Sequence, residues 1–228
     1  MAILSILGTP VTQKLSQRER ITAIIGLAVL LFLIFAGANK FGSIFLHLNP
    51  LASRDLFWWS MLFVTLGYVR LVEGRSLASI GIVRPRVMTA VSGIAAALVM
   101  MFVAFPLAGA IVSHLHLSTH SEQAAASIYG HTPAWYRWLL VTRAALVEEV
   151  VFRGYLIERT ENVTGSSLLA AILSIVTFCF AHLAFWGWQP LIGIAVGAVP
   201  LVALYLWRRD LWACILAHWV TDVVGVIL

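Results

Sequence analysis

Apolar segments recur along the whole chain, and their length constrains the fold more than any other feature. A helix needs about 20 predominantly apolar residues to cross a bilayer. We predict seven such segments, at about residues 21–38, 56–69, 87–112, 138–157, 166–185, 191–206 and 211–228, and expect Pro106 to interrupt the third. Charged residues make up only 11% of the 228 residues, against roughly 25% in soluble domains. The sequence therefore predicts an all-α, polytopic membrane protein with about seven transmembrane helices.

The distribution of basic residues predicts the orientation of these helices. When the N-terminus is placed in the cytoplasm, the inner side collects most of the basic side chains, namely Lys14, Arg18, Arg20, Arg70, Arg75, Arg84, Arg86, Arg153, Arg159, Arg208 and Arg209. The outer loops keep Lys40 and Arg54, and Arg137 lies at an outer helix end. Cytoplasmic loops are enriched in Lys and Arg, so we expect an integral protein of a bacterial-type plasma membrane with a cytoplasmic N-terminus. The net charge of +5 then reflects topology, and we expect the lipid bilayer, not nucleic acid, as a partner.

Two adjacent acids stand inside the fourth apolar segment. Glu148 and Glu149 belong to the stretch V-E-E-V-V-F-R-G-Y-L, and Arg153 follows Glu149 by four residues. Ionisable groups in a bilayer are costly and need a partner, a water-filled cavity or a function. Positions i and i+4 share a helix face, which pairs Arg153 with Glu149, whereas Glu148 points about 100° away around the turn. The pattern predicts a structural Glu149 and a free Glu148 at a buried polar site.

Two histidines and an aspartate in later segments are expected to reach the same site. Glu148 lies seventeen residues before Gly165 and His182 lies seventeen residues after it. In an antiparallel hairpin that turns at Gly165, both side chains have the same height. His218 precedes Asp222 by four residues, so these two share a helix face. The turn also carries charged residues that suit the cytosol, namely Glu158, Arg159 and Glu161.

These residue types favour hydrolytic chemistry. A glutamate and a histidine that converge can position and deprotonate a water for attack on a carbonyl carbon. A second histidine can stabilise the resulting oxyanion, and Asp222 can orient His218. The alternative is a zinc site with Glu148, His182 and His218 as ligands, since catalytic zinc sites often combine two histidines and a carboxylate. No H-E-x-x-H motif occurs, so we expect neither a metal nor another cofactor.

Three motifs in this order resemble the CAAX prenyl protease and bacteriocin-processing family, also called the Abi family. They are E-E-x-x-x-R at Glu148, Glu149 and Arg153, F-x-x-x-H at Phe178 and His182, and H-x-x-x-N/D at His218 and Asp222. The family's common F-R-G extension matches Phe152, Arg153 and Gly154. The basic stretch 76–84 resembles the connection that often precedes the family's core, whereas the first two segments match nothing specific.

The resemblance implies a glutamic-type intramembrane endopeptidase. Its catalytic residues would be Glu148 and His182, which activate water, together with His218 and Asp222 at the oxyanion site. Glu149, Arg153 and Phe178 would support them. The eukaryotic prenyl proteases carry Asn at the position of Asp222, and an ionised aspartate cannot donate a hydrogen bond to an oxyanion. Asp222 therefore either orients His218 or acts while protonated.

The implied partners are membrane-associated peptide or protein substrates, because the family's substrates range from prenylated C-terminal tails to leader peptides and sorting signals. We predict a single membrane domain over residues 1–228. Within it, residues 1–20 form a cytoplasmic N-terminus, 21–112 the N-terminal helices and 135–228 the catalytic core.

Two other functions remain open on the sequence. One is a proton-coupled carrier or channel with Glu148, His182 and His218 as its relay, and the other is a non-catalytic immunity or scaffold protein. A further group of histidines lies in the loop 113–133, namely His114, His116, His120 and His131. No cysteine or acidic ligand cluster accompanies them, so a solvated loop is favoured over a metal site.

Overall fold

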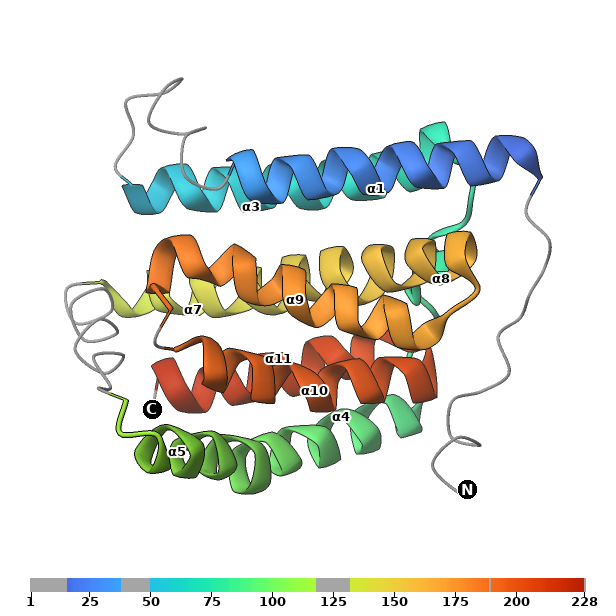
Figure 1. The fold of residues 1–228 in the computed structure, drawn as a ribbon. Coiled ribbons are helices and arrows are strands. Elements are labelled where there is room, and N and C mark those ends of the chain that lie inside the picture. The colour runs from blue at the N-terminus through green and yellow to red at the C-terminus, as the bar shows by residue number, and fades with distance from the viewer. Residues whose placement is uncertain (1–15, 38–49, 118–131, 189, 228) are drawn as a thin grey trace.

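The computed structural model describes residues 16–37, 50–117, 132–188 and 190–227, and in these residues it contains helices and no strand. The helices of the described residues form seven rods, and Figure 1 shows that these run side by side. The rods are α1 (Gln17–Gly37); α3 (Pro50–Gly67) with η1 (Tyr68–Val72); α4 (Val87–Val99) with η3 (Met100–Ala104) and α5 (Phe105–His114); α7 (Ala134–Arg143) with η4 (Ala144–Ile157) and α8 (Glu158–Thr164); α9 (Ser167–Trp186); α10 (Leu191–Arg208); and α11 (Leu211–Val226). A short 3₁₀ turn, η2 (Leu77–Ile80), connects the second and third rods.

The predicted apolar segments correspond to these rods, and the prediction of an all-helical polytopic membrane protein is confirmed. Three described helices are long and apolar enough to cross a membrane, at Ala52–Val72, Val87–His114 and Leu191–Arg208, and Ser167–Leu183 and Leu211–Val226 are shorter apolar helices. Large apolar side chains such as Phe32, Phe63 and Phe102 are exposed on the outside of the bundle. Such a surface suits contact with lipid, where water does not have to hydrate it.

The expected interruption of the third segment at Pro106 is wrong, because the rod continues through it. Pro106 lies in the first turn of α5, directly after the π-helical turn η3. In a regular α-helix the proline ring clashes with the carbonyl of the preceding turn and its missing N–H removes a hydrogen bond. A wider π turn at this point relieves both problems without ending the helix.

The hairpin predicted at Gly165 is present. Gly165 ends α8 with a φ of 73°, a left-handed conformation that glycine adopts without strain. The side chain of Ser166 then caps α9 by accepting a hydrogen bond from the backbone N–H of Leu169. Farther along, the hydroxyl of Ser174 donates to the carbonyl of Phe152 at 3.0 Å and ties the two arms together.

The centre of the bundle is η4, an unusually long π-helix. Every residue from Val147 to Ile157 is buried, and η4 packs against α3, α9 and α11. Figure 1 shows α7 and α9 between the α1–α3 layer and the layer that holds α10 and α11. The stretch with the two adjacent glutamates therefore lies in the interior, surrounded by other helices.

The charged residues at the Gly165 turn are packed against other elements, and their cytosolic location stays a prediction. Arg159 is fully buried, and its guanidinium contacts the carboxylate of Glu73 at 2.6 Å and the hydroxyl of Ser79 at 2.9 Å. Glu158 and Glu161 both pair with Arg209. A buried arginine needs such partners for its charge and its donors, so these contacts bind the hairpin to η1, η2 and the end of α10.

Some predictions fall on residues outside the described ranges. These are the topological assignments of Lys14 and Lys40 and most of the histidine loop, including His120 and His131. Within the described residues, His114 ends α5 and His116 follows it. Both cysteines, Cys179 and Cys214, are free thiols.

Candidate active site

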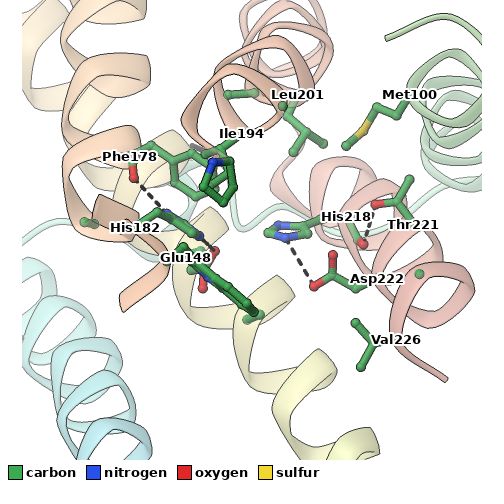
Figure 2. A pocket seen from close by; sticks show the side chains of 18 of the residues that line it. Met100, Glu148, Phe178, His182, Ile194, Leu201, His218, Thr221, Asp222 and Val226 are labelled. Carbon is green, nitrogen blue, oxygen red and sulfur yellow. Dashed lines mark hydrogen bonds and ion pairs between the residues drawn. The ribbon is translucent and has the colours of Figure 1, made fainter. Parts of the chain in front are cut away.

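A cavity of about 430 Å³ opens in the bundle beside η4. The four predicted catalytic residues line it, and they come from three rods: Glu148 from η4, His182 from α9, and His218 and Asp222 from α11. Figure 2 shows the side chains of Glu148, His182 and His218 turned toward one another. Apolar residues of other elements complete the wall, among them Trp58, Met100, Phe105, Ile194 and Leu201. The cavity thus combines an ionisable cluster with an apolar wall, as ligand sites commonly do.

Glu148 lies in the cavity wall, whereas Glu149 does not line the cavity. Oε2 of Glu148 lies 3.7 Å from Nε2 of His182, so the two side chains meet as the equal spacing about Gly165 predicts. Oε1 lies 3.7 Å from Nη1 of Arg143. Both distances exceed an ordinary hydrogen bond of about 2.7–3.2 Å, so Glu148 keeps lone pairs available to a small molecule such as water.

The contact between Arg143 and Glu148 depends on the π-helical geometry of η4. The two residues are five positions apart, and η4 begins directly after Arg143. In an α-helix of 3.6 residues per turn, positions i and i+5 point about 140° apart. A π-helix forms its hydrogen bonds between i and i+5, which brings such residues close to one face. Reasoning with α-helical spacing alone therefore missed Arg143 as a neighbour of Glu148.

His182 is held in one orientation by its own helix. Its Nδ1 lies 2.8 Å from the carbonyl oxygen of Phe178, and because a carbonyl only accepts, Nδ1 carries the hydrogen. In the neutral ring, Nε2 is then the unprotonated nitrogen. Nε2 faces Glu148, so two acceptor atoms from different helices point toward one small volume of the cavity.

Glu149 contacts His218 in addition to its predicted partner. Oε1 of Glu149 accepts hydrogen bonds from Nη1 of Arg153 at 3.0 Å and from Nδ1 of His218 at 2.8 Å. Glu149 and Arg153 are both fully buried. The pair Glu149–Arg153 was predicted from the i, i+4 spacing, but the contact to His218, 69 residues along the chain, was not. In the structure Glu149 therefore orients His218 as well as pairing with Arg153.

Asp222 lies on the other side of the His218 ring. Its Oδ2 is 3.5 Å from Nε2 of His218, and Figure 2 shows both side chains at the cavity. The imidazole thus has a carboxyl group near each nitrogen. It can donate from both nitrogens only as the imidazolium ion, and in that form its Nε2–H is a donor that faces the cavity.

Phe178 lies between the charged groups. Its ring centroid is 4.4 Å from that of His182 and 6.5 Å from that of His218. The guanidinium carbon of Arg153 lies 4.2 Å from the same centroid, a distance at which a cation is attracted to the ring face. Phe178 thus fixes the positions of three site residues by packing, in line with the supporting place that the sequence suggested for it.

Two further residues belong to the site and were not singled out from the sequence. Arg143 lines the cavity and is 6% exposed, and Asp55 on α3 lies 3.1 Å from it. Asp55 is seven per cent exposed. An arginine within the fourth apolar segment was a visible signal, because a bilayer penalises an isolated charge. Nothing in the sequence around Asp55 indicates that it is the partner of Arg143.

The same side chains include the usual ligand types for a metal ion, namely histidine and carboxylate. In the described part of the chain, no group of three or more His, Cys, Asp or Glu residues has an arrangement that would hold a metal ion. Glu148, His182 and His218 share the cavity, but His218 directs its Nδ1 to Glu149. The cluster is therefore connected by ion pairs and hydrogen bonds between its members.

Comparison with known proteins finds a match over the part of the chain that contains the site. Residues 130–224 match the family model described as Type II CAAX prenyl endopeptidase Rce1-like. This range contains η4, α9 and most of α11, and with them Glu148, His182, His218 and Asp222. Comparisons with curated proteins and with solved structures found no match. The matched region supplies these four cavity residues, so the part of the chain that builds the site is similar to the Rce1-like CAAX prenyl endopeptidases.

Proposed function

We propose that this protein hydrolyses a peptide bond of a membrane-associated substrate with a water activated by Glu148 and His182. The observation that carries the proposal is the convergence of two acceptors, Oε2 of Glu148 and Nε2 of His182, which lie 3.7 Å apart at the cavity. A single water can hydrogen-bond to both at about 2.8 Å each. Such a water has its two hydrogens directed to acceptors and its lone pairs directed into the cavity.

In the first step, the water attacks the carbonyl carbon of the scissile bond. One proton passes from the water to the carboxylate of Glu148, a new C–O bond forms, and the carbonyl π electrons move to the oxygen. His182 keeps the water oriented through its unprotonated Nε2. The negative charge that develops on the carbonyl oxygen requires a hydrogen-bond donor.

His218 supplies that donor in our proposal. Its ring is oriented by the hydrogen bond from Nδ1 to Glu149. In the imidazolium form, Nε2–H then faces the cavity at 3.5 Å from Asp222, where the oxyanion can accept a hydrogen bond from it. In the second step the tetrahedral intermediate collapses, the C–N bond breaks, and the proton on Glu148 passes to the leaving amine. The products are a carboxylic acid and an amine, which exchange a proton to give a carboxylate and an ammonium ion, and Glu148 is again ionised.

The apolar side of the cavity indicates where the substrate lies. Met100, Ile194 and Leu201 face the ionisable cluster across the cavity (Figure 2). A peptide bond next to an apolar group can place that group on this wall while its carbonyl approaches Glu148. The matching family is described by its action on CAAX prenyl substrates, so a prenylated C-terminal tail is the first substrate to test.

The test uses purified protein in liposomes with two peptides, one farnesylated near a three-residue C-terminal tail and one without the lipid. Release of the tail is followed by mass spectrometry. We expect Glu148→Gln to reduce cleavage to background while the folded yield is retained, because glutamine keeps the shape and removes the base. The matched control is Glu158→Gln, which alters a carboxylate outside the cavity. Cleavage by Glu148→Gln at the unmodified rate would refute the proposal.

The same preparation separates metal-free from zinc chemistry. We expect activity to survive prolonged exposure to strong chelators, and the purified protein to hold clearly substoichiometric zinc. Stoichiometric zinc that is lost and restored together with activity would make Glu148, His182 and His218 ligands instead. If neither peptide is cleaved, proteomics of membranes with and without the Glu148→Ala protein identifies the natural substrate by its change in size.

A further inference from the structure

A chain of charged and polar side chains reaches Glu148 from the side opposite His182. The phenol of Tyr136 donates a hydrogen bond to Oδ2 of Asp55. Oδ1 of Asp55 lies 3.1 Å from Nε of Arg143, and Nη1 of Arg143 lies 3.7 Å from Oε1 of Glu148. The two oxygens of Glu148 therefore have different neighbours, Arg143 at Oε1 and His182 at Oε2.

Arg143 has spare hydrogen-bonding capacity in this arrangement. It is 6% exposed, and among the described residues neither its Nε nor its Nη1 makes a well-aligned hydrogen bond. Its contacts to Asp55 and Glu148 are ion pairs of good distance but imperfect direction. A buried arginine with one carboxylate partner would form a close, bidentate pair with it. Here the carboxylates of Asp55 and Glu148 share one guanidinium, and Asp55 is the nearer of the two.

We propose that Arg143 and Asp55 are positioning residues that hold Glu148 ionised and directed at the water while preventing a close ion pair that would reduce its basicity. Asp55 attracts Arg143 away from Glu148, and Arg143 still provides positive charge at 3.7 Å. This inference rests on the proposed function of Glu148. Asp55 belongs to α3, outside the residues 130–224 that match the family model, so the N-terminal helices contribute to the site.

The charged and titratable groups around Glu148 come from all the elements packed against the cavity. They are Arg143 from α7, Arg153 from η4, His182 from α9, His218 and Asp222 from α11, and Arg54 and Asp55 from α3, of which Arg54 lines the cavity and Asp55 contacts Arg143. The part of α10 that lines the cavity contributes no ionisable side chain. Since each of these groups acts on the protonation of Glu148, removing one of them shifts the pH at which hydrolysis begins.

The inference predicts that substitutions of Asp55 and of Arg143 shift the acid limb of the rate–pH profile in opposite directions. Asp55→Asn frees Arg143 to close on Glu148, which favours the carboxylate, so the acid limb of the rate–pH profile moves to lower pH and kcat falls. Arg143→Met removes the cation, which favours the protonated carboxyl, so the acid limb moves to higher pH. A charge at this distance inside a protein changes a titration by at least about one pH unit. A merely structural role gives no such pair of opposite shifts.

The experiment measures kcat and KM against pH for Asp55→Asn, Arg143→Met and the double variant with the farnesylated peptide. Arg143→Met leaves Asp55 without its closest cation and can reduce folding, but the double variant leaves neither charge unpaired. We expect the double variant to fold, to show the profile of Arg143→Met, and to have at least about tenfold lower kcat with little change in KM. Arg137→Met is the matched control, because Arg137 also lies on α7 but donates to the carbonyl of Val226.

A second measurement does not need a substrate. Infrared spectra across pH report the C=O stretch of protonated carboxyl groups, and the band missing from Glu148→Gln identifies Glu148. We expect this band to appear at lower pH in Asp55→Asn and at higher pH in the double variant. Unchanged spectra and profiles in both variants overturn this inference alone, whereas full activity of Glu148→Gln overturns the proposed function. Shifts of the same sign in both variants also overturn the inference about Arg143 and Asp55.

Discussion

Two neighbouring glutamates have different surroundings although both are buried. Glu148 lines the cavity and has its closest charged neighbours at 3.7 Å, whereas Glu149 shares one oxygen between Arg153 and His218 at 3.0 and 2.8 Å. A carboxylate oxygen that accepts two close hydrogen bonds is held in place, whereas one without such close partners can still accept from a small molecule such as water. The residue-level distinction therefore follows from which face of η4 each side chain occupies.

At this scale we predict that Glu149→Gln is a stability variant and Glu148→Gln is not. Glu149→Gln leaves the guanidinium of Arg153 uncompensated in the interior, and breaking a buried pair in this way costs about 3–5 kcal/mol. We expect a clearly lower thermal unfolding midpoint in detergent, followed by tryptophan fluorescence, and a lower folded yield. The isosteric Glu148→Gln serves as the control and should unfold near the unmodified protein. Equal midpoints for the two variants would contradict the assignment of Glu149 as the anchor.

The element that organises the site is η4, and its packing depends on a glycine. A Cβ added at Gly154 would lie 2.8 Å from the backbone carbonyl oxygen of Ile80 and 3.3 Å from a methyl carbon of Leu211. The backbone oxygen cannot move without displacing η2. Gly154 thus permits the close approach of η4 and the connection between the second and third rods, which gives the F-R-G extension a structural reason.

We therefore expect Gly154→Ala to destabilise the protein, by about 1–3 kcal/mol as for other overpacked interiors. The matched control is Gly109→Ala on α5, where an added Cβ meets no atom within 4 Å and where alanine favours the helix. Thermal unfolding of both variants in the same detergent gives the comparison. If the Gly154→Ala protein is as stable as the Gly109→Ala protein, η2 can move to accommodate the added Cβ, and the close contact at Gly154 does not contribute to stability.

On the scale of the whole molecule, the N-terminal helices contact both ends of the rod formed by α7, η4 and α8. Asp55 contacts Arg143 at one end, and Glu73 contacts Arg159 beyond the other. Glu73 accepts hydrogen bonds from Nε of Arg159 at 2.9 and 3.0 Å and from the hydroxyl of Tyr155 at 3.0 Å. Since these residues are far apart in sequence, the contacts bind the two halves of the chain into one body.

A double-mutant cycle tests the contact between Glu73 and Arg159. Glu73→Gln and Arg159→Met should each lower the unfolding midpoint strongly, because each leaves a buried polar partner unsatisfied. The double variant should lose less than the sum of the two. The comparison is Arg209→Met at the same end, because the Arg209 side chain is 34% exposed and we expect its pairs to contribute less. Additive losses would mean that the two residues stabilise the fold independently.

Much of the architecture follows from the sequence because it depends on local properties. The length and composition of the apolar segments predict the rods, since a membrane-spanning helix satisfies its own backbone hydrogen bonds. The spacing about Gly165 predicts that Glu148 and His182 lie at one height, and the i, i+4 spacing predicts the Glu149–Arg153 pair. These inferences need only the geometry of one helix or one hairpin.

Tertiary structure decided the features that depend on how separate rods pack. The wide turns of η4 bring Arg143 to Glu148, and no single-residue propensity marks such a stretch. The partners Asp55 for Arg143, Glu73 for Arg159 and Glu149 for His218 lie 88, 86 and 69 residues apart. A buried charge shows from sequence only that it needs a partner. Which residue meets that need is set by the packing of helices, because a charge in a low-dielectric interior pairs with the group that packing places beside it.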